Sequence, residues 1–433
     1  MTQTGPAALL RRLAQRVEGK APGPRACRHE IPVTAYSDPA RFQRERQRLF
    51  RRRPLVLGHA SQLPAAGDAL VWDWLGLPLI TLRDRQGSLA TFKNVCRHRG
   101  MRLVQEQGCT RLRSLVCPYH QWTYGLDGTL RNIPRQEMFT ALDADTLGLA
   151  PVATEVRHGL IWVQVEGSLD LDTHLAGLGE DLDAFDLADY HFCEQSVRSV
   201  QANWKLIQDA FLDAYHVTRL HKDTVGQFFP DALAESDLIG DHTRSAVARN
   251  EIEEAPALAD EELDLRRHAT FSYTVFPGSV LVFQPDYPAV ISLFPQAPDR
   301  TLFVHSMLTR EPPKSEQERD HFRRSFKLID EGVFAAEDVF VAVGTQRGID
   351  SGANQALLFG GLEEAAVRFH EIIEREKNMA AAVKQLLLHR NLSKQPGAVA
   401  VASSSKKSMK KIAPAPKSAK KSAAAKAKKK DSA

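Results

Sequence analysis

Four candidate metal ligands in two short mixed segments constrain this chain more than any other feature of its sequence. Cys96 and His98 lie near the start of the stretch 94–122, and Cys117 and His120 lie near its end. Each segment offers one thiolate and one imidazole, and eighteen residues separate His98 from Cys117. Both segments follow strand-like sequence, so a β framework is expected to support the two loops.

The mixed composition of each segment decides between two kinds of metal centre. Zinc fingers usually take two Cys from one loop and two His from a helix. Here two neighbouring irons fit better, with Cys96 and Cys117 on one iron and His98 and His120 on the other. That is the ligand set of a Rieske [2Fe–2S] centre, in which His ligation raises the reduction potential. The side chains expected to shield this cluster from water are Pro118, Tyr119, Trp122 and Tyr124.

The composition is that of an ordinary globular protein with several domains. The chain has 433 residues, of which 43% are hydrophobic and 25% are charged. The first twenty residues lack a signal-peptide core, and no apolar run reaches the roughly 18 to 20 residues that a membrane span requires. The three other cysteines, Cys27, Cys109 and Cys193, do not suggest a disulfide framework. We therefore predict a reducing, cytoplasmic location without membrane contact.

The last forty residues differ sharply from the rest of the chain. From Lys394 onward the sequence carries a net charge of +11, which leaves −7 for the body. Its Lys, Ala, Ser and Pro content predicts disorder over 393–433. The tail is interpreted either as a solubilising appendage or as a nucleic-acid contact, although no aromatic residue is interleaved for base stacking.

The remaining chain predicts an α+β protein with two principal domains. Residues 1–50 read as helices that pack on the catalytic domain. Short apolar runs separated by turn sequences predict an all-β Rieske domain over 51–165. Residues 166–392 mix helices with successive antiparallel strands and predict the catalytic domain, which closes with a long amphipathic helix from about 362 to 389.

A second set of candidate ligands lies in the stretch 203–221. Mononuclear non-haem iron that reacts with O2 is typically held by two His and one carboxylate. His216 and His221 offer the imidazoles, but five residues on an ideal helix place them roughly 140° apart. We therefore expect a widened or broken helix near Thr218 to Leu220.

Two places in the sequence offer the carboxylate of this second site. Asp213 lies three residues before His216, so it could bind the metal or accept a hydrogen bond from a ligand histidine. Glu337 and Asp338 lie in an otherwise apolar helical stretch. A buried Asp338 would need a cationic partner, and a metal ion is a sufficient one.

With these motifs in place, the chain resembles the α subunits of Rieske non-haem iron oxygenases, the aromatic ring-hydroxylating dioxygenase family. The resemblance covers about residues 50 to 375 and includes NVCRHRG, CPYHQWTYGLDGTL, NWKLIQDAFLDAYHVTRLH, FPGSVLVF and EDVFVAVGTQRG. It implies a Rieske domain beside a helix-grip catalytic domain with an antiparallel sheet. Two departures stand out, because the family often has Gly where this chain has Gln121, and an Asn where it has Ala210.

The resemblance also implies roles for individual residues. Asp213 would be the catalytic bridging acid, which links a cluster histidine of one subunit to the iron site of its neighbour in a head-to-tail trimer. The implied cofactors are the [2Fe–2S] cluster and a mononuclear Fe(II), with O2 as co-substrate. The implied cluster ligands are Cys96, His98, Cys117 and His120, and the implied ligands of the mononuclear iron are His216, His221 and Asp338.

The expected activity is that of a terminal oxygenase. Electrons from NAD(P)H would arrive through a separate reductase, with or without a ferredoxin, because the chain shows no nucleotide-binding glycine motif after a strand. The substrate is expected to be a small aromatic or apolar molecule, as in aromatic hydrocarbon catabolism, within a homotrimer that has or lacks a β subunit. The alternatives are a Rieske electron carrier with a degenerate second site and a zinc-bearing nucleic-acid-binding protein.

Overall fold

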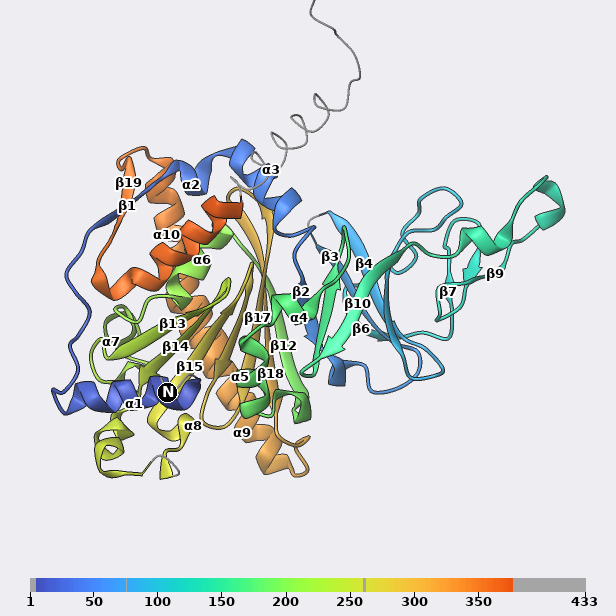
Figure 1. The fold of residues 1–433 in the computed structure, drawn as a ribbon. Coiled ribbons are helices and arrows are strands. Elements are labelled where there is room, and N and C mark those ends of the chain that lie inside the picture. Colours follow the sequence, from blue (N-terminus) through green and yellow to red (C-terminus); the bar gives the residue numbers. More distant parts are fainter. Residues whose placement is uncertain (1–4, 75, 260–261, 377–433) are drawn as a thin grey trace, which may run out of the picture. The chain divides into compact units, whose positions relative to one another are not determined.

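The fold is the predicted α+β arrangement, and it is built around two large antiparallel sheets (Figure 1). The computed structural model describes residues 5–74, 76–259 and 262–376. The predicted tail over 393–433 and the last part of the long C-terminal helix lie outside these residues. Within them the helix runs from 364 to 376. No helix in the described ranges has both the length and the apolar composition that a membrane span needs.

The first large sheet carries the loops that contain Cys96 and Cys117. It has seven strands in the order β2-β11-β10-β5-β4-β3-β6, and a three-stranded sheet in the order β7-β8-β9 accompanies it. The two strands at one end of this order, β2 and β11, are buried along their whole length. The strands are β2 (Leu55–His59), β3 (Asp68–Trp74), β4 (Leu77–Arg83), β5 (Leu89–Lys93), β6 (Gly108–Arg111), β7 (Leu115–Val116), β8 (Thr123–Tyr124), β9 (Leu130–Asn132), β10 (Pro151–Arg157) and β11 (Leu160–Gln164).

The second large sheet supports the catalytic domain. Its seven antiparallel strands follow the order β12-β18-β17-β16-β15-β14-β13, so β12 and β13 are the edges. A further two-stranded sheet pairs β1 with β19. The strands are β1 (His29–Pro32), β12 (His191–Val200), β13 (Ala234–Ile239), β14 (His242–Ala248), β15 (Ala269–Val275), β16 (Ser279–Phe283), β17 (Pro288–Ala297), β18 (Arg300–Thr309) and β19 (Ala356–Phe359).

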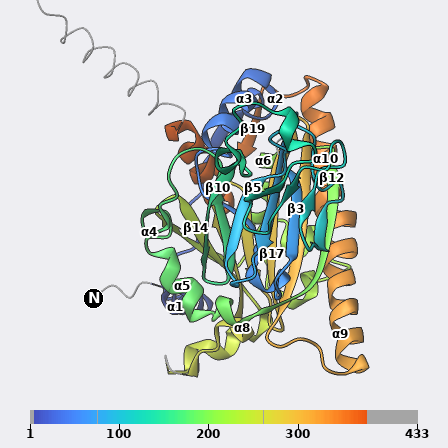
Figure 2. The same cartoon turned by 90° about the vertical axis from the view of Figure 1, so that its right-hand side faces the viewer.

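One long helical run accompanies the catalytic sheet (Figure 2). It passes from α9 into a π-helix, Leu328–Asp338, and then into α10. A π-helix of this length is rare, and such distortions occur mostly at functional sites. The helices are α1 (Pro6–Val17), α2 (Thr34–Ser37), α3 (Pro39–Arg48), α4 (Leu171–His174), α5 (Leu178–Ala184), α6 (Trp204–Phe211), α7 (Val217–Leu220), α8 (Leu265–His268), α9 (Glu316–Lys327) and α10 (Val339–Asp350).

Three apolar clusters hold these elements together. The largest joins Leu57 and Trp72 of the first sheet to Ile291 of the second and to Phe334 of the π-helix. Another packs α1 against the opposite face of the second sheet. The third lies under the loops of Cys96 and Cys117. Because the first cluster draws on both sheets, the two domains share one core.

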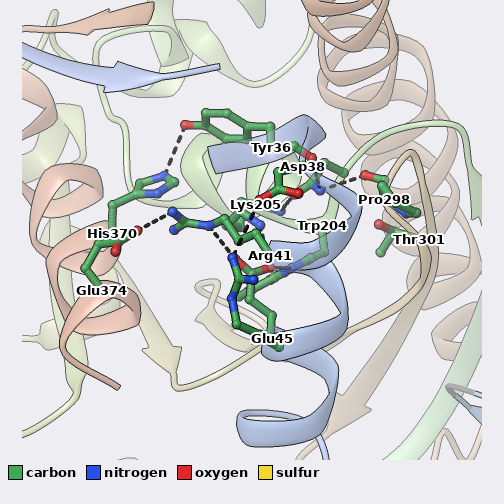
Figure 3. Close-up of polar contacts among 12 residues, drawn as sticks. Tyr36, Asp38, Arg41, Glu45, Trp204, Lys205, Pro298, Thr301, His370 and Glu374 are labelled. Carbon is green, nitrogen blue, oxygen red and sulfur yellow. Dashed lines mark hydrogen bonds and ion pairs between the residues drawn. The ribbon is translucent and has the colours of Figure 1, made fainter. Parts of the chain in front are cut away.

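A buried polar cluster fixes helix α6, which leads directly into the second candidate site (Figure 3). Glu45 of α3 accepts hydrogen bonds from Lys205 Nζ at 2.6 Å and from Trp204 Nε1 at 3.1 Å. Burial lowers the pKa of Lys205, although the charge of Glu45 acts in the opposite direction. Beside this pair, Tyr36 donates to Asp209 of α6 at 2.7 Å. Buried charges of this kind are stable only when they are paired, so the contacts restrict the position of α6.

Candidate metal centres

The loops of Cys96 and Cys117 have the same backbone geometry. In each, the Cys N–H donates to the carbonyl five residues later, at 2.8 Å, while the N–H four residues later donates back to the Cys carbonyl. In both loops the residue four positions after the Cys has a left-handed backbone conformation, with φ of 76° at Gly100 and 60° at Gln121. A glycine adopts this conformation without strain, and other residues do so at a cost. The departure at Gln121 therefore replaces a glycine where one would suit the backbone.

The four candidate ligands of these loops converge. The rings of His98 and His120 lie 4.7 Å apart, and the Nδ1 atom of each ring is buried without a hydrogen-bond partner. Cys96 and Cys117 are 2% and 1% exposed. Burial raises the pKa of the Cys96 thiol, so a thiolate there needs a positive partner such as a metal ion. Burial lowers the pKa of His98, which keeps its imidazole neutral for metal binding. The donor set fits a [2Fe–2S] cluster with mixed ligation.

The aromatic surroundings of this site differ in part from expectation. Trp122 is 3% exposed and stacks on His98 at 4.8 Å between ring centroids. Tyr124 is fully buried, with its hydroxyl 3.4 Å from Cys96 Sγ. Tyr119 is 54% exposed although it stacks on His120, and Pro118 is exposed. Shielding by Pro118 was therefore wrong, because the loop turns that ring outward.

The second site brings together three candidate ligands from separate elements. The ligand atoms of His216, His221 and Asp338 all lie within 4.8 Å of one another. The Nε2 atoms of the two histidines are 3.6 and 3.5 Å from Asp338 Oδ1. That oxygen is buried and has no hydrogen-bond partner. A buried carboxylate oxygen facing two imidazoles fits a divalent metal held by two His and one carboxylate.

A broken helix allows the two histidines to face each other. Helix α6 ends at Phe211, and the one-turn helix α7 is flanked by His216 at its start and His221 at its end. The prediction of a distortion was correct, but its location was wrong. Residues 218–220 are helical, whereas the chain turns before His216 and after Leu220. Each histidine lies at a terminus of the helix, so the 100° rotation per residue of a regular helix does not fix the direction of its ring.

Each candidate ligand histidine has a carboxylate at its other ring nitrogen. Asp213 Oδ2 lies 3.1 Å from His216 Nδ1, and Glu337 Oε2 lies 2.7 Å from His221 Nδ1. Thr224 Oγ1 also donates to Glu337 Oε2, at 2.8 Å. Such contacts fix the tautomer and leave Nε2 free for a metal. The role of Glu337 was missed from the sequence, where its position next to Asp338 in an apolar helix was the available signal.

The protonation of this site reflects burial and neighbouring charge. Burial raises the pKa of the Asp338 carboxyl, while His221 and His216 act in the opposite direction. Burial disfavours the charged form of His216, but the hydrogen bond and charge of Asp213, with Asp338, outweigh it and raise the pKa. Without a metal, these three groups depend on one another for charge balance.

A small, mostly apolar cavity of about 130 Å³ adjoins the three candidate ligands. Phe211, Val217 and Phe334 line it. Leu212 is buried and lines a neighbouring cavity. The described lining residues include no Lys or Arg. For scale, an engineered apolar cavity of about 150 Å³ in another protein binds benzene.

Two known protein families match the parts of the chain that contain these sites. Residues 53–147 match the family described as the Rieske [2Fe-2S] domain, and residues 187–376 match the ring hydroxylating alpha subunit catalytic domain. The chain belongs to the Rieske non-haem iron oxygenase α-subunit family. Its cofactors are accordingly a Rieske [2Fe–2S] cluster and a mononuclear iron, and each candidate ligand set fits its group.

The relatives of this α subunit include quaternary ammonium monooxygenases. It is 31% identical over 243 residues to a glycine betaine monooxygenase oxygenase subunit of Pseudomonas aeruginosa, covering 56% of this chain and 55% of that protein. It is 30% identical over 194 residues to a carnitine monooxygenase oxygenase subunit of Escherichia coli, covering 44% and 52%. The chain therefore spans about half the length of the curated relatives it matches. These names do not support the expected link to aromatic hydrocarbon catabolism.

A solved structure shares the fold. A quaternary ammonium Rieske monooxygenase, described with carnitine oxidation by gut microbiota and inter-subunit electron transfer, has a TM-score of 0.69 at 19% identity. The match covers 87% of this chain and all of the other. At this identity the likeness concerns the fold alone.

Proposed function

We propose that this chain is the terminal oxygenase component of a multicomponent system that hydroxylates a small organic substrate. The observation that carries the proposal is the convergence of His216, His221 and Asp338 beside an apolar cavity, in a chain that also carries a Rieske domain. A pure electron carrier would not need a preserved set of three ligands. The family match also leaves no support for a zinc-bearing nucleic-acid-binding protein.

The ligand assignment follows the chemistry of the donor atoms. Two buried thiols and two imidazoles with unpartnered Nδ1 atoms would hold the cluster. Two imidazole Nε2 atoms and a carboxylate would hold the mononuclear iron. When bound, the cluster supplies single electrons and the iron supplies the site at which O2 reacts. The proposed cluster ligands are Cys96, His98, Cys117 and His120, and the proposed ligands of the mononuclear iron are His216, His221 and Asp338.

Asp213 would connect the two centres in an assembly of several copies. Its Oδ2 contacts His216 Nδ1, and its Oδ1 accepts from the Tyr215 N–H at 2.5 Å. Because the side chain is still 19% exposed, it would contact a cluster histidine of a neighbouring copy in the assembly. It would hold the proton on His216 Nδ1 and keep Nε2 directed to the metal. Electron transfer between copies would pass through such a contact. We propose a head-to-tail homotrimer, with electrons supplied by a reductase, directly or through a ferredoxin.

The cavity restricts the substrate. Betaine and carnitine carry a carboxylate, and the described lining of the 130 Å³ cavity offers no cationic side chain to pair with one. A buried carboxylate without a partner is costly. The proposed substrate of this chain is therefore a small molecule whose reacting part is apolar and lacks a carboxylate.

Asp213 gives the sharpest test of this function. The Asp213→Ala protein is expected to keep cluster and iron, while O2 with substrate present reoxidises its dithionite-reduced cluster at least tenfold more slowly. Asp231→Ala is a matched control, because Asp231 is an exposed acid that pairs with Arg219. Stopped-flow absorbance of the cluster measures the rate. Unchanged reoxidation in Asp213→Ala would contradict the proposed bridge.

A further inference from the structure

An unpartnered hydroxyl points to a hydrogen-bonding substrate. Thr270 of β15 lines the 130 Å³ cavity and is 7% exposed, and its Oγ1 is buried without a hydrogen-bond partner. A buried hydroxyl left unpaired is unfavourable, so such groups usually have a partner in the functional state. A ligand oxygen in the cavity that Thr270 lines would supply this partner.

A row of serines continues from this cavity toward the sheet edge. Ser272 of β15 lies opposite Ser245 of β14, which lies opposite Ser236 of the edge strand β13. Directly opposed residues share a face of the sheet, and the Oγ atoms of Ser236 and Ser245 are 2.8 Å apart. Ser272 is half-buried, Ser245 is 9% exposed and Ser236 is exposed. We call Ser272, Ser245 and Ser236 the serine row.

The serine row lies in a second, larger cavity next to the first. This outer cavity has a volume of about 580 Å³ and contains all three serines. It shares Ser272 and Phe211 with the inner cavity, so the two adjoin at β15. Two strand spacings of about 4.8 Å separate β15 from β13, which gives a path of about 10 Å.

The charges around the outer cavity are already paired. Glu235 and Asp237 of β13 also line this cavity, and both are held in ion pairs. A charged ligand group would therefore have to compete with these partners for a counter-charge, while hydroxyl, ether or carbonyl oxygens would find serines. The ion pairs are Glu235 with Arg16, Asp237 with Arg244 and Glu364 with Arg368, and Asp213 accepts a hydrogen bond from His216 Nδ1.

We propose that the substrate is a neutral, elongated molecule that spans both cavities. Its reacting end occupies the inner cavity and is about the size of one ring. This end carries one oxygen that hydrogen-bonds to the Thr270 hydroxyl. Its other end carries a further oxygen that lies along the serine row about 10 Å away. This inference rests on the proposed function, because it places the reacting end beside the iron ligands.

Binding calorimetry with three probes of equal length tests this inference. The probes are 4-(4-hydroxybutyl)phenol, the anion 4-(4-hydroxyphenyl)butanoate and the cation formed by 4-(4-aminobutyl)phenol. The neutral alcohol is expected to bind at least tenfold more tightly than either charged probe. Thr270→Val and Ser245→Ala are each expected to weaken its binding about three- to tenfold, as the loss of one hydrogen bond would. Ser199→Ala, on the opposite edge strand, is the matched control and should bind as the wild type does.

Each result bears on one claim. If a charged probe binds as tightly as the alcohol, or if Thr270→Val and Ser245→Ala bind like Ser199→Ala, the inference is overturned. The iron content and the Rieske EPR signal of the same samples test the proposed function independently of the substrate inference. Protein that holds both metal centres but does not prefer the alcohol would refute only the substrate inference.

Discussion

Removing the Glu337 carboxylate, which contacts His221, should weaken binding of the mononuclear iron without disturbing the cluster. Glu337 Oε2 lies 2.7 Å from His221 Nδ1, and His221 is 4% exposed, so water cannot readily replace the contact. Loss of such a partner typically lowers metal affinity 10- to 100-fold, or about 1.4 to 2.7 kcal/mol. Glu337→Ala should show this loss. Glu337→Gln should lose less, because its amide oxygen can still accept from Nδ1–H.

Iron retained against increasing chelator measures this effect, with the Rieske EPR signal as an internal reference. Glu331→Ala is the matched control, since Glu331 lies on the same π-helix with a 65% exposed side chain. The chelator concentration that removes half of the mononuclear iron should fall in Glu337→Ala and stay unchanged in Glu331→Ala. Equal retention in the two variants would refute the role of Glu337. Loss of the EPR signal in Glu337→Ala would show a general folding defect instead.

Three further predictions concern stability. Burial lowers the pKa of His59 to about 4, so the folded state binds fewer protons than the unfolded state below pH 6.5. About 3 kcal/mol should therefore be lost as the pH falls from 6.5 to 4, and urea unfolding should show a flatter pH dependence in His59→Gln. Lys205→Met should lower the free energy of unfolding by about 3 kcal/mol, because Glu45 loses a buried partner; an unchanged urea midpoint would contradict this. Gln121→Gly should unfold at a temperature equal to or above that of the wild type, whereas Gln121→Val should unfold lower, because a β-branched residue tolerates a φ of 60° poorly.

The local ligand patterns were readable in the sequence because they are short and chemically distinctive. The mixed Cys and His loops predicted that His98 and His120 would lie close together, and their rings do so at 4.7 Å. Asp338 lies close to His216 because residues 328–338 form a long π-helix. No residue type in this range predicts a π-helix. The helix break was predicted from spacing alone, but its location depends on where α6 ends.

Other features depend on contacts that sequence separation hides. The contact of Glu337 with His221 joins residues 116 positions apart, and only the packing of the π-helix brings them together. The serine row depends on strand register, which sets Ser245 opposite both Ser236 and Ser272. Periodicity predicts which residues share a face of one strand, but it does not set the register between strands.

The most direct test of the account is the metal content of the wild type and of His216→Ala. Iron and acid-labile sulfide per chain would be measured together with EPR of the dithionite-reduced protein. We expect about three irons and about two sulfides in the wild type, with a Rieske signal. His216→Ala should lose about one iron and keep the signal. A wild type with only the cluster, and a variant identical to it, would contradict the oxygenase and leave an electron carrier.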